Sequence, residues 1–172
     1  MATMQKITSN LWFDKQAEEA AGFYTSIFKN SSIGKMSRYG KEGFEVHGMP
    51  EGAVMVVEFW LEGQQFLALN GGPHFKFNEA ISFVINCNTQ EEVDYYWEKL
   101  TQGGDPKAQM CGWLKDKYGL SWQVVPTILD ELMADPDQEK AGRVMNAMLQ
   151  MKKLDIQTLK AAFEGNQRMA VS

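Results

Sequence analysis

The chain has 172 residues, of which 44% are hydrophobic, and this is enough to bury a core in one domain or in two small halves. Its formal net charge of -5 argues against nucleic-acid binding, because nucleic-acid-binding surfaces concentrate Lys and Arg. There is no apolar run of membrane-spanning length, no secretion-signal pattern at the start, and no disulfide framework from the two cysteines. We therefore expect a cytoplasmic protein that binds neither nucleic acid nor membrane.

The first part of the chain reads as one strand, one helix and three further strands. The strand "QKITSNLWF" precedes Asp14, which we predict to be the N-cap of a helix with apolar residues at three- and four-residue spacing. Strands then follow at "SSIGKMSRY", "AVMVVEFWL" and "QFLALN", the last two joined by a hairpin turn at Glu62-Gly63.

The second part repeats this order in a shorter form. The strand "ISFVINC" leads into the capping box "TQEE" and a second helix, and the hairpin "CGWLKDKYGLSWQVVP" follows, with Asp116 predicted to shape its turn. A shift of about 73 positions, the offset from Ala20 to Val93, superimposes the apolar stripes of the two helices, which indicates a duplication. The segment before the hairpin is too short for more than a remnant strand.

We therefore predict the α+β class and one domain over residues 1–165. It contains a first module at 1–72, a second and shortened module at 79–126, and a helical extension at 127–165. The helices of this extension are amphipathic, so we expect them to pack on the outside of the sheet or across a subunit boundary. Residues 166–172 are predicted to be a disordered tail.

The stretches "LWFDKQAEEAAGFYTSIF", "ALNGGPHFKF", "ISFVINCNTQEEVDYYWEKL" and "CGWLKDKYGLSWQVVP", in this order, resemble the PhnB-like branch of the vicinal oxygen chelate superfamily. The resemblance implies a glyoxalase-like fold of two βαβββ modules with cupped mixed sheets, a homodimer, and small-molecule pockets. Some relatives carry a methyltransferase label, but this sequence has no Gly-rich turn of the kind that holds an adenosyl cofactor. We expect no cofactor.

The metal enzymes of this superfamily place His, Gln and Glu on inward strand positions. By the resemblance, Thr8 and Ala80 stand near the first ligand positions of the two modules, Gln123 stands where many relatives have Glu, and the fourth position falls near Ala68 or Asn70. Such residues bind a divalent ion poorly, so we expect no metal site.

Strand alternation predicts which side chains line a pocket, since residues two apart share a face. The candidates are polar or aromatic residues on the expected inward faces, together with Glu58, an acid in an apolar run. Trp60 is a further possible wall. The predicted ligand-binding residues are Thr8, Asn10, Trp12, Glu58, Asn70, Phe77, Ser82, Cys111, Trp113 and Gln123.

Each candidate also has a purely structural explanation. Tryptophans dominate cores and dimer interfaces as well as pockets, Ser82 and Gln123 could simply bond to neighbouring strands, and an edge strand would expose Glu58 to solvent. Cys111 has no base near it in the sequence, and unpaired cysteines are often small buried hydrophobes.

Three functions remain open from the sequence. The favoured one is a metal-free small-molecule-binding protein that sequesters its ligand or catalyses an unidentified step. The alternatives are a metal-dependent lyase or dioxygenase and a dimeric scaffold without ligand.

Overall fold

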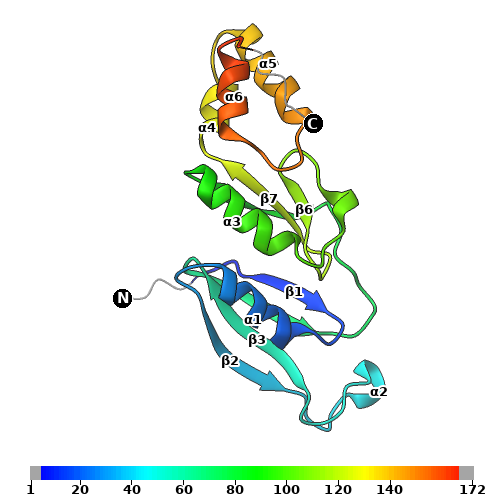
Figure 1. Ribbon diagram of the computed structural model, residues 1–172. Helices are drawn as coiled ribbons and strands as arrows, with labels where there is room; N and C mark the ends of the chain where they lie inside the picture. The colour runs from blue at the N-terminus through cyan, green and yellow to red at the C-terminus, as the bar shows by residue number, and fades with distance from the viewer. Residues whose placement is uncertain (1–4, 167–172) are drawn as a thin grey trace. The chain divides into compact units, whose positions relative to one another are not determined.

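The computed structural model describes residues 5–166, and the chain divides into two compact units, Met1–Phe77 and Asn78–Ser172 (Figure 1). The first unit contains β1 (Ser9–Phe13), α1 (Ala17–Ile27), β2 (Ser32–Arg38), α2 (Phe44–His47), β3 (Val54–Leu61) and β4 (Gln64–Asn70). The second contains β5 (Ser82–Cys87), α3 (Gln90–Thr101), the 3-10 turn η1 (Pro106–Ala108), β6 (Trp113–Lys115), β7 (Ser121–Pro126), α4 (Ile128–Met133), α5 (Gln138–Leu149) and α6 (Ile156–Phe163). The α+β class is confirmed.

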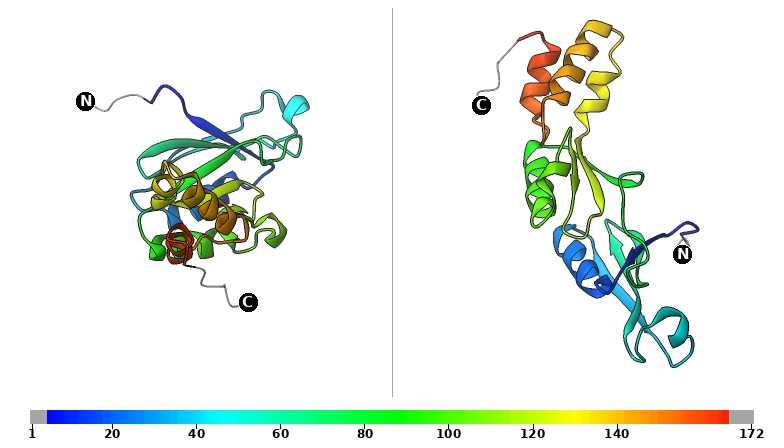
Figure 2. Two further views of the ribbon diagram at one scale, coloured as in Figure 1. Left: turned by 90° about the horizontal axis from the view of Figure 1, so that it is seen from above. Right: turned by 90° about the vertical axis from the view of Figure 1, so that its right-hand side faces the viewer.

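The first unit is a four-stranded sheet, here sheet A, with α1 along one face (Figure 2). Its strand order is β1-β4-β3-β2, with β1 parallel to β4 and the other pairs antiparallel. Alternate strand residues are buried on the α1 side, because burial of an amphipathic helix needs an apolar sheet face. These core residues are Leu11, Phe13, Val57, Phe59, Leu61, Phe66 and Ala68. In each unit, we call the face of the sheet that is turned away from the long helix the distal face. The long helix is α1 in the first unit and α3 in the second.

The start of α1 differs from the prediction that Asp14 caps it. The N-cap is Gln16, which makes no side-chain cap bond. The N–H of Ala17 instead donates to Oδ1 of Asn70 at 2.8 Å, while Nδ2 of Asn70 donates to the carbonyl of Val54 at 3.0 Å. The cap thus comes from the end of β4, a neighbour in the folded sheet that a local sequence pattern does not reveal.

The second unit contains a three-stranded sheet, sheet B, in the order β5-β7-β6 with β5 parallel to β7. The Thr89 half of the predicted capping box at α3 is present, since Oγ1 of Thr89 accepts from the N–H of Glu92 at 3.3 Å. Oε2 of Glu92 reaches one residue before the cap and accepts from the N–H of Asn88 at 2.7 Å. Between α3 and β6 there is only η1, so the second unit has one strand fewer than the first.

The β6–β7 hairpin is organised around the carboxyl group of Asp116, which is 2% exposed. Its Oδ1 accepts from the N–H groups of Tyr118 at 2.8 Å and Leu120 at 3.1 Å, and its Oδ2 accepts from Nε1 of Trp122 at 2.9 Å. The hairpin-shaping role predicted for Asp116 is therefore confirmed.

The helices α4, α5 and α6 gather beside one another at the end of β7 (Figures 1 and 2). They bury an apolar cluster that includes Leu132, Val144, Leu154 and Leu159. None of the helices in residues 5–166 is long and apolar enough to cross a membrane. Of the tail predicted beyond Gly165, all but Asn166 lies outside the described residues.

Candidate functional site

The distal face of sheet A carries one carboxylate among apolar and aromatic side chains. Glu58 on β3 is paired with Leu67 on β4, and Leu67 is in turn paired with Asn10 on β1, so the three form a row across the sheet. Glu58 is half-buried. The alternative that Glu58 belongs to an edge strand is wrong, because β3 lies between β4 and β2. Its carboxylate therefore lies in the middle of the distal face and not at an edge of the sheet.

Trp12 stands on the same face, one row along the sheet, where it is paired with Leu69. Its Nε1 donates to the carbonyl of Gly72 at 2.9 Å, and its ring meets Phe75 edge-on at 4.9 Å between centroids. A Cβ at Gly71 would lie 2.3 Å from the Trp12 ring, so the indole lies directly against the backbone there. These contacts fix the orientation of the indole. Thr8 lies just before β1, is half-buried, and has the same strand parity as Trp12.

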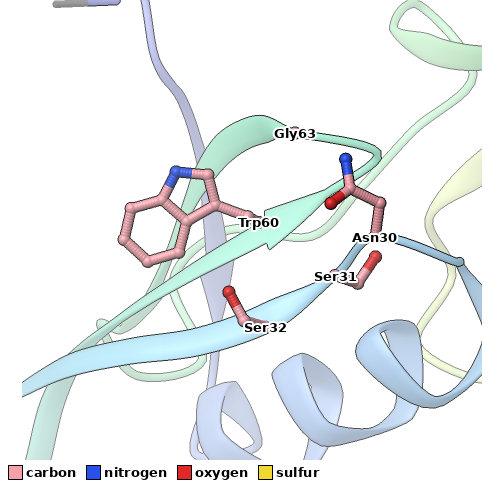
Figure 3. Close-up of a pocket in the computed structure, with 5 residues that line it drawn as sticks. All are labelled: Asn30, Ser31, Ser32, Trp60 and Gly63. Atoms are coloured by element: carbon pink, nitrogen blue, oxygen red, sulfur yellow. The ribbon is translucent and has the colours of Figure 1, made fainter. Parts of the chain in front are cut away.

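Trp60 forms one wall of a hollow of about 480 Å³ at the other end of the distal face. Figure 3 shows its ring on one side of the hollow, with Asn30 and Ser31 on the opposite side and Ser32 on the adjacent strand. Gly63 completes the lining. An aromatic wall facing hydroxyl and amide groups is a combination typical of small-molecule sites.

Gly34 on β2 makes room for the Trp60 ring. A Cβ at this position would lie 2.3 and 2.9 Å from two ring atoms of Trp60, so we expect Gly34→Ala to displace the indole and to lower the free energy of unfolding by about 1–3 kcal/mol. The shift of the Trp60 indole N–H resonance and chemical denaturation would measure the two effects.

A matched control for this substitution is Gly22→Ala on α1, where nothing lies within 4 Å of the added Cβ. This change should raise the free energy of unfolding by roughly 0.5–1 kcal/mol, since Ala is the better helix former. An unchanged Trp60 resonance in Gly34→Ala would contradict the packing described above.

The distal face of sheet B is more polar. Ser82 on β5 is paired with Ser121 on β7, which is paired with Lys115 on β6; in the next row Gln123 on β7 is paired with Trp113 on β6. Nε2 of Gln123 donates to Oγ of Ser82 at 2.9 Å. The structure thus brings the predicted residues Ser82, Trp113 and Gln123 together on one face of one sheet.

Three other predicted ligand-binding residues lie elsewhere. Asn70 is on the helix side of sheet A, where both ends of its amide are used in the bonds that hold Ala17 and Val54. Phe77 lies outside the strands and its ring meets Phe13, a core residue of the helix side, at 5.3 Å. Neither belongs to a distal face, because Asn70 shares the strand parity of Ala68, which is buried on the α1 side, and Phe77 is not in a strand.

Cys111 is the third of these residues. The predicted strand arm begins two residues later, at Trp113, and Cys111 lies in the preceding turn with a φ of 52°. Its N–H donates to the carbonyl of Met151 at 2.8 Å, so the turn is fastened to the segment between α5 and α6. Cys111 is half-buried.

Cys87 is the buried cysteine, and burial, reinforced by the negative charge of Glu92, raises the pKa of its thiol to about 12. At pH 8, Cys87 is therefore in the reactive thiolate form in only about one molecule in ten thousand. We expect iodoacetamide at pH 8 to modify Cys111 and to leave Cys87 intact in the folded protein, as measured by peptide mass spectrometry. Both should react in denaturant, and equal rates in the folded protein would contradict the raised pKa.

Among the described residues, no three His, Cys, Asp or Glu side chains lie together in a way that could hold a metal ion. His47 lies in α2, where Nδ1 accepts from the N–H of Met49 at 3.0 Å and Nε2 lies 3.1 Å from the carbonyl of Glu42. These backbone bonds give His47 a local structural role.

The predicted ligand-binding residues did not include Lys115, although it lies on the distal face, and they left out Ser121, although strand parity already placed it on the same face as Gln123. Parity also places Lys115 on this face, because it is two residues after Trp113. The hollow beside Trp60 has no comparable signal, since it depends on Asn30 and Gly63 meeting across a turn.

The sequence matches the family model described as 3-demethylubiquinone-9 3-methyltransferase over residues 5–125. The solved structure of a PhnB protein from Bacillus cereus is 40% identical, covers 72% of this chain and 100% of its own, and superimposes with a TM-score of 0.60. A Staphylococcus aureus protein is 31% identical over 71% of this chain and 96% of its own, with a TM-score of 0.32.

A protein from Pseudomonas aeruginosa is 18% identical over 72% of this chain and 98% of its own, with a TM-score of 0.54, and shares the fold alone. No protein with a curated description matches the chain.

Proposed function

Because the chain belongs to the 3-demethylubiquinone-9 3-methyltransferase family, a PhnB-like branch of the vicinal oxygen chelate superfamily with a glyoxalase-like fold, we propose that it binds a small organic molecule in the cytoplasm. The binding surfaces are the distal faces of its sheets. The observation that carries the proposal is the group formed by Ser82, Gln123 and Trp113 on sheet B.

This group has the composition of a ligand site. Trp113 offers a half-buried aromatic surface next to the side-chain amide of Gln123, which is itself oriented by its bond to Ser82. Small-molecule sites combine apolar walls with a few oriented polar groups in this way. On sheet A, Trp12 and Glu58 provide a second surface of the same kind.

The proposal involves no resident metal. Divalent metal sites in proteins use several imidazole, thiolate or carboxylate ligands, whereas the distal faces offer hydroxyl and amide groups and the single carboxylate of Glu58. Gln123 is already bonded to Ser82.

The methyl transfer in the family's description does not fit this chain. An adenosyl methyl donor is commonly held at a Gly-rich turn between a parallel strand and a helix. Here the β1–α1 connection is Asp14-Lys15-Gln16 and the β5–α3 connection is Asn88-Thr89, neither with a glycine. We therefore propose no methyltransferase step.

The proposal includes a homodimer. Supporting this, β5 is an edge strand of sheet B whose Val84 is 51% exposed, and the adjoining Ile81 is 70% exposed. Apolar side chains on an unpaired edge favour association with another chain.

Native mass spectrometry of protein purified without chelator tests the proposal. We expect a dimer that carries an organic mass and loses it under mild activation. A stoichiometric divalent ion that only a chelator removes would contradict the metal-free site. Ligand-detected NMR would measure the binding of a library of small organic fragments. A monomer that binds none of these fragments would contradict the binding function.

A further inference from the structure

We propose that the distal face of sheet B binds an oxyanion, the carboxylate or phosphoryl group of an acidic small molecule. The inference rests on the proposed function and names the chemical class of its ligand. It follows from the hydrogen-bonding capacity of one row of side chains, Ser82, Ser121 and Lys115, together with the neighbouring Trp113 and Gln123.

The row crosses all three strands of sheet B. Ser82 is directly paired with Ser121, and Ser121 with Lys115, so two serines and a lysine occupy neighbouring positions on one face. Neighbouring strands are about 4.8 Å apart, a spacing that allows adjacent side chains to reach the oxygens of one small anion.

Ser121 has an unsatisfied hydroxyl group. The residue is 1% exposed, and its Oγ has no hydrogen-bond partner among the described residues. A buried polar group without a partner is costly, and such groups in folded proteins call for a specific explanation. An acceptor oxygen bound between Ser82 and Lys115 would provide the missing bond.

Two neighbouring side chains on this face also have a donor to spare. Oγ of Ser82 already accepts from Gln123, which leaves its own proton to donate. Within residues 5–166 the indole N–H of Trp113 makes no hydrogen bond, and an indole can only donate. A face rich in unused donors is complementary to a ligand rich in acceptors, which is what a carboxylate or phosphoryl group offers.

Lys115 supplies the positive charge and already binds a carboxylate. Its Nζ forms an ion pair with Oε1 of Glu79, and this bond lowers the pKa of Glu79. The side chain of Glu79 is 63% exposed, against 25% for Lys115. Because exposed ion pairs are weak, a ligand oxyanion can replace Glu79 while Lys115 stays in place.

The test is an NMR titration of the wild-type protein with inorganic phosphate and, separately, with acetate, at constant ionic strength. We expect saturable chemical-shift changes of the backbone amides of Ser82, Ser121 and Gln123. Because the net charge of -5 disfavours unspecific anion binding, such changes indicate a specific site. Tighter binding of phosphate identifies a phosphoryl ligand, and tighter binding of acetate identifies a carboxylate ligand.

Three variants make the test specific. Lys115→Gln should weaken anion binding about tenfold, since it removes a charge-assisted bond. Glu79→Gln should strengthen it, because the competing carboxylate is gone, a result that a merely structural ion pair would not give. Lys107→Gln, which removes a charge from the exposed η1 turn, should leave the affinity unchanged.

No saturable shift with either anion, or equal affinity in Lys115→Gln and wild type, would overturn the oxyanion site. If an organic molecule still co-purifies with Lys115→Gln in that case, the small-molecule function stands and only the ligand class is wrong. If no organic molecule or fragment binds the wild type, the proposed function itself fails.

Discussion

Replacing Asp116 with Ala is expected to lower the free energy of unfolding by roughly 3 to 5 kcal/mol, a large part of the stability of a typical domain. The carboxyl group is 2% exposed and accepts from the N–H groups of Tyr118 and Leu120 and from the indole of Trp122. The substitution leaves these three donors without their acceptor in a buried setting. Chemical denaturation followed by circular dichroism would measure the change.

Two variants test the physical reason. Asp105→Ala also removes a carboxyl group that accepts a backbone bond, from Lys107 at 2.9 Å, but in an exposed turn, so we expect a loss of about 1 kcal/mol or less. Asp116→Asn keeps the shape and one acceptor oxygen and should fall between the two. A loss in Asp116→Ala as small as in Asp105→Ala would show that the hairpin does not depend on the carboxyl group.

The double substitution Trp113→Ala with Gln123→Ala is expected to weaken the binding of organic fragments to sheet B by about thirtyfold or more. Loss of an aromatic contact and of one oriented hydrogen bond together correspond to about 2 kcal/mol, and each 1.4 kcal/mol is a factor of ten in Kd. Saturation-transfer NMR on fragments that shift the β5–β7 amides of the wild type would measure the loss.

The fold must survive for this result to be informative. Trp113 and Gln123 are half-buried on the distal face, whereas the core of the second unit lies on the α3 side, so we expect an unchanged circular dichroism spectrum. Tyr95→Ala with Gln157→Ala removes an aromatic ring and an amide from exposed helix positions and should not alter fragment binding. Equal fragment affinity in the Trp113 and Gln123 variant would remove these residues from the proposed site.

The sequence was a good guide wherever local periodicity determines structure. Alternation along β1 correctly places Asn10 and Trp12 on the face opposite Leu11 and Phe13, since a strand residue and its second neighbour must share a face. The capping box at Thr89 and the turn at Asp116 are also local, because each is completed within a few residues of chain.

It was a poor guide wherever residues distant in the chain meet. Asn70 looks like a pocket residue in the sequence, but the folded sheet brings it to the first turn of α1, 53 positions earlier, where it replaces the cap predicted at Asp14. Cys111 looks like a strand residue, but the segment near Met151 holds it in a turn.

The sequence by itself determined the α+β class, the order of the elements in both modules and, for most strands, which residues lie on the distal face. These features depend on spacing along one strand or helix. Only the tertiary structure decided that Glu58 lies on an inner strand, that Ser82, Ser121 and Lys115 form one row, and that Ser121 lacks a partner. Strand order and register come from pairing between distant segments, and spacing within a single segment carries no information about its partner.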